Sequence, residues 1–228
     1  MNKSTKIGSQ IYTPFTLKLY DWWVLKMSNH FAWKCPTHDV LVPHFTEYAG
    51  NEHLDIGVGT GFYLTHLPET THISLMDINT NSLAVASNRI GSTRVKECIQ
   101  HDVFEPFPAQ YHGYFDSISM FYLLHCLPGA LKDKVQVIAN TAMGLKTGGT
   151  LYGATILGND AGHNRLGKKL MKVYNSKGIF SNKDDTEDGL HAMLSSQFRD
   201  VAITRVGMVV LFYRNRPPRV IYSPCIEF

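Results

Sequence analysis

The stretch "LDIGVGTGFYLTH", residues 54–66, decides the fold of this chain. A short apolar run leads there into three glycines, Gly57, Gly59 and Gly61, directly behind the acidic Asp55. Glycine lacks a Cβ atom, so the backbone at three alternate positions is open to close approach by a ligand. In an open α/β sheet, ligands bind beyond the carboxyl ends of the strands, so we expect a binding site at this loop.

Strand-length apolar runs alternate with helical stretches along most of the chain. The strand-like runs span residues 52–58, 72–78, 95–103, 114–124 and 150–157, and the helical patterns span 62–68, 79–90, 131–145 and 190–198. Such alternation is typical of βαβ units and of a mostly parallel sheet with helices on both faces. Residues 201–215 form two further strand-like runs that meet at Gly207, which predicts a hairpin with an antiparallel last strand. We therefore expect an α/β, doubly wound, seven-stranded, mostly parallel sheet.

The composition fits one globular domain and excludes several classes of protein. The chain has 228 residues, of which 44% are hydrophobic and 18% charged, enough to bury a core without disulfides. The four cysteines have no zinc-binding spacing, the N-terminus lacks the apolar region of a signal peptide, and no apolar run approaches the roughly 18 residues of a membrane helix. A formal net charge of +3 is small for a nucleic-acid-binding protein. We expect a cytoplasmic protein with no nucleic-acid or membrane partner.

The glycine spacing argues against a nucleotide pyrophosphate as the ligand. A dinucleotide fingerprint, G-x-G-x-x-G, needs a small residue at position 62 or 64, where this chain has Phe62 and Leu64. The Gly-Lys-Ser/Thr ending of a Walker loop is absent from this stretch. A carboxylate at Asp55 would repel a phosphate, yet it suits the ammonium group of a ligand. The loop thus favours a cationic, amino-acid-like ligand.

Two further aspartates follow later strands. Asp77 ends the second strand, where an acidic side chain can bind both hydroxyls of a ribose. Asp102 follows the third strand, placed to accept a hydrogen bond from an exocyclic adenine amine. A strand-end aspartate is also a common helix cap, so each acid alone carries little weight. One acid each for an amino group, a ribose and an adenine describes S-adenosylmethionine.

With these features, the chain resembles the class I S-adenosylmethionine-dependent methyltransferases over nearly its whole length. The resemblance implies that this cofactor, with S-adenosylhomocysteine as its product, is bound by the residues at matching positions, Asp55, Gly57, Gly59, Gly61, Asp77, Ile78, Asp102 and Val103. It also implies one methyltransferase domain with four parts. These are an N-terminal helical lid (1–50), a cofactor-binding core (51–157), a substrate-binding insertion (158–189), and the last helix and C-terminal strands (190–228).

The N-terminal helical pattern carries many aromatic residues. In the family that the chain resembles, such a helix closes over the cofactor, so we expect Tyr20 at the cofactor and Trp22, Trp23 and Trp33 at the acceptor. Aromatic rings there can exclude water and face a sulfonium or a planar acceptor. Packing between helices is the competing interpretation, and it accounts for part of this set.

The stretch after the fourth strand bears on the reaction. Base-methylating enzymes of this fold carry Asn/Asp-Pro-Pro-Tyr/Phe there, whereas this chain has "MFYLLH", residues 120–125. The acidic and amide ligands of metal-dependent catechol enzymes are missing too, so we expect no metal. "FYLLHCLPG", with "FAWKCPT" upstream and "ATILG" downstream, resembles small methyltransferases of natural-product pathways. We expect O-methylation of a phenol or enol hydroxyl on a polyketide-like or other secondary metabolite.

Two histidines are candidates for the catalytic base. His125 lies just past the fourth strand, close to where the methyl group should project, and its ordinary pKa near 6.5 suits proton removal from a phenol or enol. His163 is the second choice. A histidine in an apolar stretch is more often a core or capping residue, which is the competing interpretation.

The insertion lies where this fold usually builds its acceptor pocket. We expect the acceptor to be bound there by Asn164, Met171, Tyr174, Asn175, Phe180 and Asn182, together with Tyr122 after the fourth strand. Lys177, Asp184 and Asp185 lie in the same region. We interpret the two aspartates as part of a solvated loop.

Three alternatives to O-methylation stay open. A small-molecule N-methyltransferase needs no strong base but favours acidic residues around the pocket. A member of the fold that binds the cofactor without transferring methyl would act as a binding module or catalyse a rearrangement. A protein or RNA methyltransferase should show a recognition domain or a broad basic face, and neither is visible. We expect a small-molecule acceptor as partner, and a monomer or homodimer.

Overall fold

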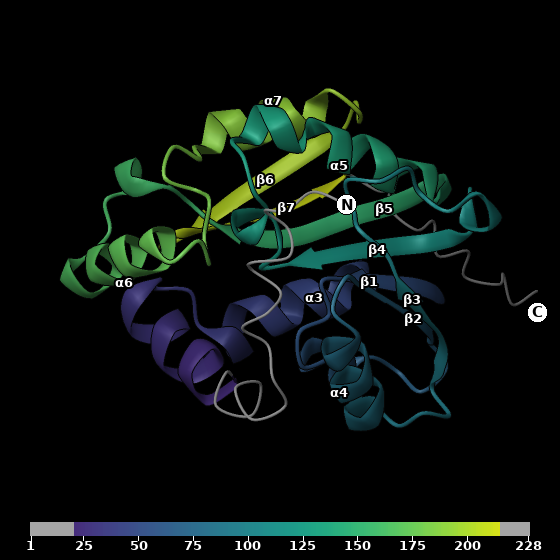
Figure 1. Cartoon of the computed structure of the whole chain (residues 1–228). Helices are drawn as coiled ribbons and strands as arrows, with labels where there is room; N and C mark the ends of the chain where they lie inside the picture. The colour runs from purple at the N-terminus through teal and green to yellow at the C-terminus, as the bar shows by residue number, and fades with distance from the viewer. Residues whose placement is uncertain (1–20, 215–228) are drawn as a thin grey trace, which may run out of the picture.

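A computed structural model describes residues 21–214, which form a seven-stranded sheet with helices on both faces (Figure 1). The strands are β1 (Glu52–Ile56), β2 (His72–Asp77), β3 (Val95–Gln100), β4 (Phe115–Phe121), β5 (Leu145–Ile156), β6 (Val201–Val206) and β7 (Val209–Arg214). Their order across the sheet is β3-β2-β1-β4-β5-β7-β6. Strands β1 to β5 pair in parallel, and β7 runs antiparallel to both β5 and β6. The predicted doubly wound sheet with an antiparallel last strand is confirmed.

Helices form a layer on each side of the sheet (Figure 1). On one side lie α3 (Val42–Tyr48), α4 (Thr80–Ile90), α6 (Arg165–Ser176), and the π-helical η1 (Asp21–Ala32) and η2 (Thr37–Leu41). On the other side lie α5 (Leu131–Met143) and α7 (Glu187–Ser195). Short 3-10 turns complete the described chain: η3 (Tyr63–His66), η4 (Ala109–Tyr111), η5 (Leu124–Cys126) and η6 (Asn159–Ala161).

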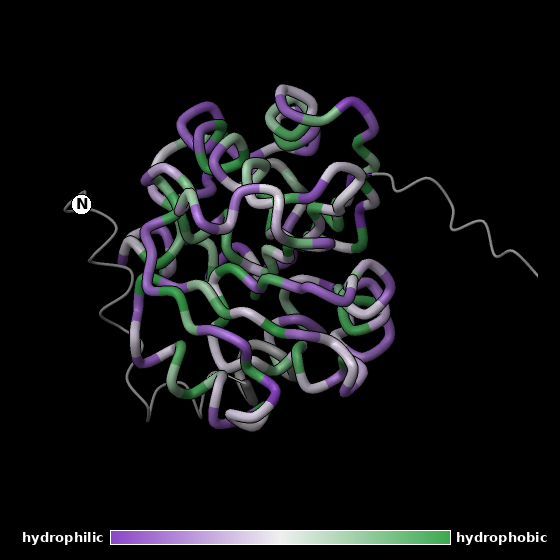
Figure 2. Tube along the Cα trace, turned by 90° about the vertical axis from the view of Figure 1, so that its right-hand side faces the viewer, coloured by the Kyte–Doolittle hydropathy of each residue, from purple (hydrophilic) through white to green (hydrophobic). Residues whose placement is uncertain are grey.

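The core is divided by the sheet into two apolar clusters. Successive residues of a strand point to opposite faces, so Leu54 of β1 packs with Phe115 and Ile118 below α5 and α7, while Ile73 of β2 packs with Phe45 on the other face. Parallel strands that are covered on both faces read as continuous apolar runs, which explains the strand-like runs of the sequence. Figure 2 shows apolar segments through the interior and hydrophilic segments at many outer turns.

The expected helix over residues 62–68 is only the short turn η3. The Leu67 N–H bonds to the Leu64 carbonyl, which is an i→i+3 bond, and the Thr65 hydroxyl bonds to the Phe62 carbonyl. Pro68 follows immediately and disfavours a helical conformation at the residue before it. The turn therefore ends before a first α-helical turn is complete.

The segment between α6 and α7 is fixed to the sheet by buried polar contacts. The Ser181 N–H donates to the His125 carbonyl at 2.8 Å, and the Gly158 N–H donates to the Asp185 carbonyl at 2.7 Å. Lys134 of α5 is fully buried, and its Nζ lies 3.0 Å from the Ser181 carbonyl and 3.2 Å from Asp185 Oδ2. This cation thus joins α5 to a segment about fifty residues further along the chain.

The substitution Lys134→Met is expected to lower the free energy of unfolding by about 3–5 kcal/mol, because it leaves the buried Asp185 carboxylate without its cation. Urea denaturation followed by circular dichroism measures this change. The matched double variant Lys134→Met/Asp185→Leu removes both charges and is expected to recover most of the loss. Equal losses in the single and double variants would contradict the ion pair as their cause.

Candidate functional site

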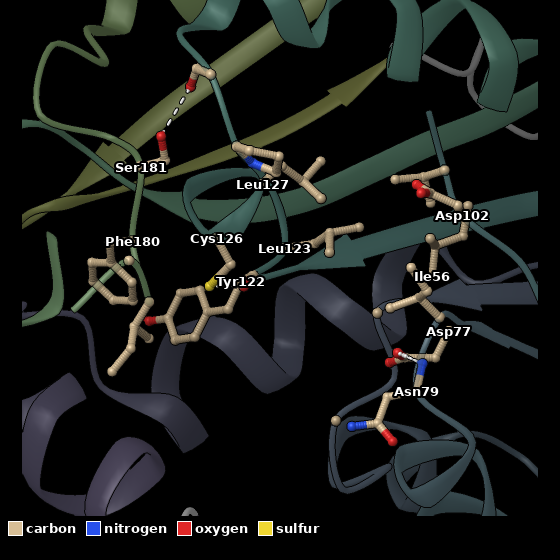
Figure 3. A pocket seen from close by; sticks show the side chains of 18 of the residues that line it. Ile56, Asp77, Asn79, Asp102, Tyr122, Leu123, Cys126, Leu127, Phe180 and Ser181 are labelled. Atoms are coloured by element: carbon tan, nitrogen blue, oxygen red, sulfur yellow. Dashed lines mark hydrogen bonds between the residues drawn. The ribbon is translucent and has the colours of Figure 1, made fainter. Parts of the chain in front are cut away.

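A cavity of about 630 Å³ opens at the carboxyl ends of β1, β2 and β4 (Figure 3). The strand order reverses between β1 and β4, and open α/β sheets bind ligands at such a point. The lining residues come from the ends of β1 and β2 with the start of α4, from residues 101–103, from residues 121–130, and from residues between 175 and 185. The glycine loop therefore forms one wall of a cavity that reaches the segment after α6.

The three glycines of the loop have different neighbours. Gly57 and Gly59 line the cavity with φ values of +77° and +52°, in the left-handed region that glycine adopts readily. A Cβ at Gly59 would meet no protein atom within 4 Å, whereas one at Gly57 would lie 2.9 Å from Leu123. Gly61 does not line the cavity, and a Cβ there would lie 2.9 Å from the Cβ of Ala86 in α4. Gly61 thus permits close packing of α4 rather than ligand approach.

Asp55 lies behind the glycine loop and not in the cavity wall, unlike the ammonium-binding position expected for it. The strand places its side chain on the same face as His53, where Ser119 of β4 lies opposite in the register. The Ser119 hydroxyl donates to Asp55 Oδ1 and lies 3.2 Å from His53 Nε2. Burial raises the pKa of Asp55 to about 7, with a smaller effect of the nearby Asp77 carboxylate and an opposing hydrogen bond from Ser119.

Asp77 and Asp102 both line the cavity, with Ile78 and Val103 beside them. Asp77 Oδ1 accepts the Asn79 N–H at 2.8 Å, and Asp102 Oδ1 accepts the Phe104 N–H at 3.1 Å. Burial raises the pKa of Asp77 to about 6, although bonds from backbone N–H groups oppose this shift. Figure 3 shows both aspartates on the same side of the cavity. Backbone N–H groups thus hold both carboxylates in place, and both carboxylates line the same cavity.

The opposite end of the cavity is aromatic and apolar. Tyr122 and Phe180 line it, with Leu123 and Leu127 between them and the aspartates (Figure 3). Tyr122 has a φ of +59°, which is uncommon for a bulky residue, and its hydroxyl donates to Asn29 Oδ1 of η1 at 2.9 Å. The N-terminal segment therefore contacts a wall of the cavity.

Some predicted acceptor residues lie away from the cavity. Asn175 and Phe180 line it, but Asn164 caps α6 and donates to the Phe31 carbonyl at 2.7 Å. Asn182 is fully buried and donates to the Ile156 carbonyl at 2.9 Å. Both of these amides therefore bond to the fold rather than face a ligand.

The remaining predicted acceptor residues are aromatic or apolar. Trp33 and Met171 are each 1% exposed and belong to the core on the α6 side. Tyr174 packs edge-on against Phe180 at 4.9 Å, behind the cavity wall. Tyr20 lies outside the described residues, as do the side chains of Trp22 and Trp23.

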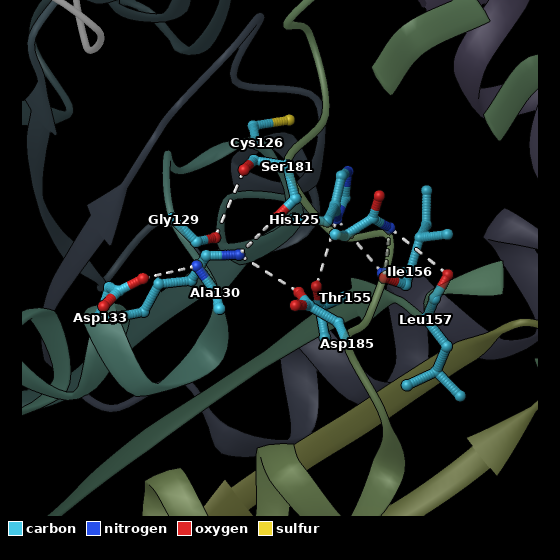
Figure 4. A network of polar contacts seen from close by, with 12 residues as sticks. His125, Cys126, Gly129, Ala130, Asp133, Thr155, Ile156, Leu157, Ser181 and Asp185 are labelled. Atoms are coloured by element: carbon cyan, nitrogen blue, oxygen red, sulfur yellow. Dashed lines mark hydrogen bonds and ion pairs between the residues drawn. The ribbon is translucent and has the colours of Figure 1, made fainter. Parts of the chain in front are cut away.

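The geometry argues against the base role that we expected for His125. The ring is 2% exposed, does not line the cavity, and packs edge-on against Phe180 at 4.5 Å. Its Nδ1 lies 3.2 Å from the Ile156 N–H donor and from the Thr155 hydroxyl, so the lone pair that a base would use already accepts a backbone bond (Figure 4). Burial, helped by the Lys134 charge, lowers the pKa of His125 to about 3.

His163 fits a base role no better. It is 4% exposed and does not line the cavity. Its Nε2 lies 2.8 Å from the Gly158 carbonyl and therefore carries the proton, and the ring packs edge-on against Trp33 at 5.6 Å. Both histidines sit at the expected point of the chain, but their rings are turned into the protein.

Several lining residues were missed from the sequence. Two groups stand out: apolar positions after β4, which are Leu123, Cys126 and Leu127, and polar positions after α6, which are Ser181, Lys183, Asp184 and Asp185. Asp185 is 5% exposed, so it is no part of a solvated loop, while Asp184 is exposed as expected. One signal was available: Lys134 shares the buried face of α5 with Leu131, Ile138 and Thr141, and a lysine on an apolar helix face needs a buried partner.

No group of three or more His, Cys, Asp or Glu side chains within residues 21–214 is placed to hold a metal ion. No helix within the same range is long and apolar enough to cross a membrane.

Comparisons with known proteins agree with this geometry. A family model described as "Methyltransferase domain" matches residues 54–151. The YbcY protein of Escherichia coli (strain K12) is 59% identical over 82% of this chain and 96% of its own length. A physcion biosynthesis cluster O-methyltransferase of Aspergillus chevalieri is 38% identical over 93% of this chain and 96% of its own length.

A solved structure extends the likeness to the fold. Haemonchus contortus Phospholethanolamine N-methyltransferase 2, in complex with phosphomonomethylethanolamine and S-adenosylhomocysteine, matches 90% of this chain and 47% of its own with a TM-score of 0.64. At 17% identity this similarity concerns the fold alone. The family match and the relatives go further: this chain belongs to the methyltransferases and has the class I fold.

Proposed function

We propose that this chain uses S-adenosylmethionine to methylate a phenol or enol hydroxyl of a small polyketide-like or other secondary metabolite. One observation carries the proposal: a single cavity joins a glycine loop with two carboxylates to an aromatic, apolar compartment. The first end suits a nucleoside with an amino-acid tail. The second end suits a flat, weakly polar acceptor.

The residues at the glycine-loop end fit S-adenosylmethionine in shape and chemistry. The backbone at Gly59 borders open space that a Cβ would fill. Asp77 and Asp102 follow consecutive strands, where carboxylates bind ribose hydroxyls and an exocyclic amine. Ile78 and Val103 add apolar surface that suits an adenine ring. Asp55 stays a candidate for the ammonium end, acting through the loop backbone or through water.

The chain's own contribution to the reaction is alignment and exclusion of water. When bound, S-adenosylmethionine supplies a methyl group on a positively charged sulfur, which an acceptor oxygen takes by in-line displacement. Holding cofactor and acceptor together in a dry pocket lowers the barrier of such a step, because the entropy cost of bringing them together is met on binding and not in the reaction step. Tyr122 and Phe180 wall the acceptor end, and Leu123 and Leu127 line the space between the two ends, where their apolar side chains would exclude water from a bound cofactor and acceptor.

An N-terminal lid is part of the proposal. The bond between Tyr122 and Asn29 of η1 ties the N-terminal segment to the acceptor end of the cavity, which supports this role. Closure of that segment would bury the reacting atoms from solvent.

Oxygen is the acceptor atom that the relatives favour. The Aspergillus chevalieri relative is named as an O-methyltransferase and matches nearly the whole chain. Transfer to a small amine is the second candidate, and it is favoured by the Asp184 and Asp185 carboxylates in the cavity wall, which can accept a hydrogen bond from an amine N–H. The two candidates differ in the product that they predict.

Methyl-labelled S-adenosylmethionine and a panel of probe acceptors test the proposal. The panel contains hydroxylated naphthalenes and anthraquinones together with the matching aryl amines. We expect mass spectrometry to find hydroxylated probes that gain a methyl group on oxygen. Label in the amines alone would assign nitrogen as the acceptor atom, and a protein that binds S-adenosylhomocysteine but labels no probe would contradict methyl transfer.

Gly59→Ala is expected to weaken S-adenosylhomocysteine binding about tenfold or more, because the new Cβ enters the cavity, with a loss of about 1.4 kcal/mol of binding free energy. Isothermal titration calorimetry measures the affinity. The matched control is Gly91→Ala: Gly91 also has a positive φ, of +88°, and open space around a Cβ, but lies outside the cavity. An equal loss of affinity in both variants would point to backbone strain and contradict the placement of the cofactor.

His125→Asn is expected to lower kcat less than about tenfold, whereas loss of a general base costs about 10²–10⁴-fold. The pH dependence of kcat between pH 5 and 9 is expected to stay as in wild type. The reason is that burial holds the pKa of His125 near 3, so the ring stays neutral throughout this range. Asparagine Oδ1 can replace Nδ1 as the acceptor for the Ile156 N–H. A loss of about 100-fold or more, with disappearance of an inflection near neutral pH, would restore His125 as the base.

A further inference from the structure

A buried ion pair stands at the acceptor end of the cavity. Lys134 Nζ lies 3.2 Å from Asp185 Oδ2 and 3.0 Å from the Ser181 carbonyl, and the lysine is fully buried. Asp185 is 5% exposed and lines the cavity together with Ser181. Lys134, which does not line the cavity, thus holds the Asp185 carboxylate in the cavity wall.

The two oxygens of the Asp185 carboxylate differ in their surroundings. Oδ2 faces Lys134, whereas Oδ1 has no hydrogen-bond donor among residues 21–214. Oδ1 is also not fully buried. The side-chain oxygens of the described chain that are both fully buried and without a hydrogen-bond partner do not include it. An ionised carboxylate accepts several hydrogen bonds, so Oδ1 keeps its capacity to accept one from a molecule in the cavity.

Other polar groups in this part of the wall are already committed or poorly suited. The Tyr122 hydroxyl donates to Asn29, and the Ser181 hydroxyl donates to the Gly129 carbonyl at 3.3 Å. Burial raises the pKa of the Cys126 thiol to about 12, so it is no base near neutral pH. Asp184 is exposed and makes no ion pair within the described residues. Asp185 is the carboxylate at this end that the fold holds in place.

We propose that Asp185 is a catalytic residue that accepts the hydrogen bond and then the proton of the acceptor hydroxyl, and that Lys134 is its positioning residue. This inference rests on the proposed O-methylation and names the group that serves it. In the step, the acceptor oxygen forms a bond to the methyl carbon while the methyl–sulfur bond breaks and its electron pair stays on sulfur. The hydroxyl proton moves to Asp185 Oδ1 and then to solvent. Charge and atoms balance without a further reactant.

The groups around Asp185 decide its titration. Burial raises the pKa of Asp185, the Lys134 cation opposes this rise, and Asp184 adds to it. On α5, burial lowers the pKa of Lys134, and the Asp185 charge opposes that shift. His125 and Cys126 on η5 are both close enough to feel the Lys134 charge and are neutral near pH 7. The Lys134 cation thus favours the ionised form of Asp185, against the effect of burial.

A pair of probe acceptors separates proton removal from binding. 1-Naphthol carries its hydroxyl proton at pH 8, whereas 4-nitro-1-naphthol is already ionised there. If neither is turned over, the corresponding pair is built on the panel scaffold that wild type methylates. Asp185→Asn is expected to lower kcat about 100-fold or more on the protonated probe and less than about tenfold on the ionised one. Asp188→Asn, which changes an exposed carboxylate of α7 outside the cavity wall, is expected to leave the ratio of the two rates as in wild type.

The pH profile assigns the role of Lys134. In wild type, kcat on the protonated probe falls as the pH drops through the Asp185 pKa. Lys134→Met raises that pKa, so the acidic limb is expected to move to higher pH, whereas a purely structural role would lower kcat without moving it. If Lys134→Met does not fold, the two-probe ratio of Asp185→Asn decides the inference alone.

The outcomes distinguish the two levels of the proposal. Equal losses on both probes in Asp185→Asn would overturn the base role and leave O-methylation standing. A wild-type protein that labels no hydroxyl in the whole panel would overturn the proposed function, and the role of Asp185 with it.

Discussion

The site depends on the reversal of strand order between β1 and β4. The chain leaves β1 toward β2 and leaves β4 toward β5, so the two connections diverge and leave a gap between them at the carboxyl ends of these strands. The cavity opens there, and the turns after β1, β2, β3 and β4 become its walls. Positive φ values at Gly57 and Tyr122 let the turns after β1 and β4 leave the sheet sharply. The strand order thus determines where the cavity lies, and the side chains of the turns determine what lines it.

Chain position was enough to predict that Asp77 and Asp102 line the same part of the sheet edge. Asp77 and Asp102 follow neighbouring parallel strands, and such strand ends must meet at one edge of the sheet. It was not enough for Asp55 or His125, because the direction of a side chain depends on the register of the strand and on packing. Asp55 follows the alternation of β1 toward Ser119, and His125 turns toward Thr155 and Ile156. Lys134 and Asp185 were missed as a pair because tertiary packing alone brings them together.

Buried polar groups lie behind both ends of the cavity. Below the glycine loop, His53, Ser119 and Asp55 form a chain of contacts between β1 and β4. Behind the acceptor end, Lys134 and Asp185 face each other. Buried charges of this kind add little net stability compared with well-packed apolar residues. At the acceptor end, the ion pair instead fixes the position of the Asp185 carboxylate, which lines the cavity.

The charge balance of the acceptor end bears on the acceptor itself. Lys134 and Asp185 neutralise each other within the wall, and Lys183 and Asp184, both exposed, add one charge of each sign. The end therefore has no net charge to attract a protonated amine, although it holds a carboxylate oxygen that can accept a hydrogen bond. A neutral hydroxyl donor on an aromatic scaffold meets both conditions, since Tyr122 and Phe180 supply the apolar surface. Electrostatics and shape at this end thus suit the proposed hydroxyl acceptor better than a protonated amine.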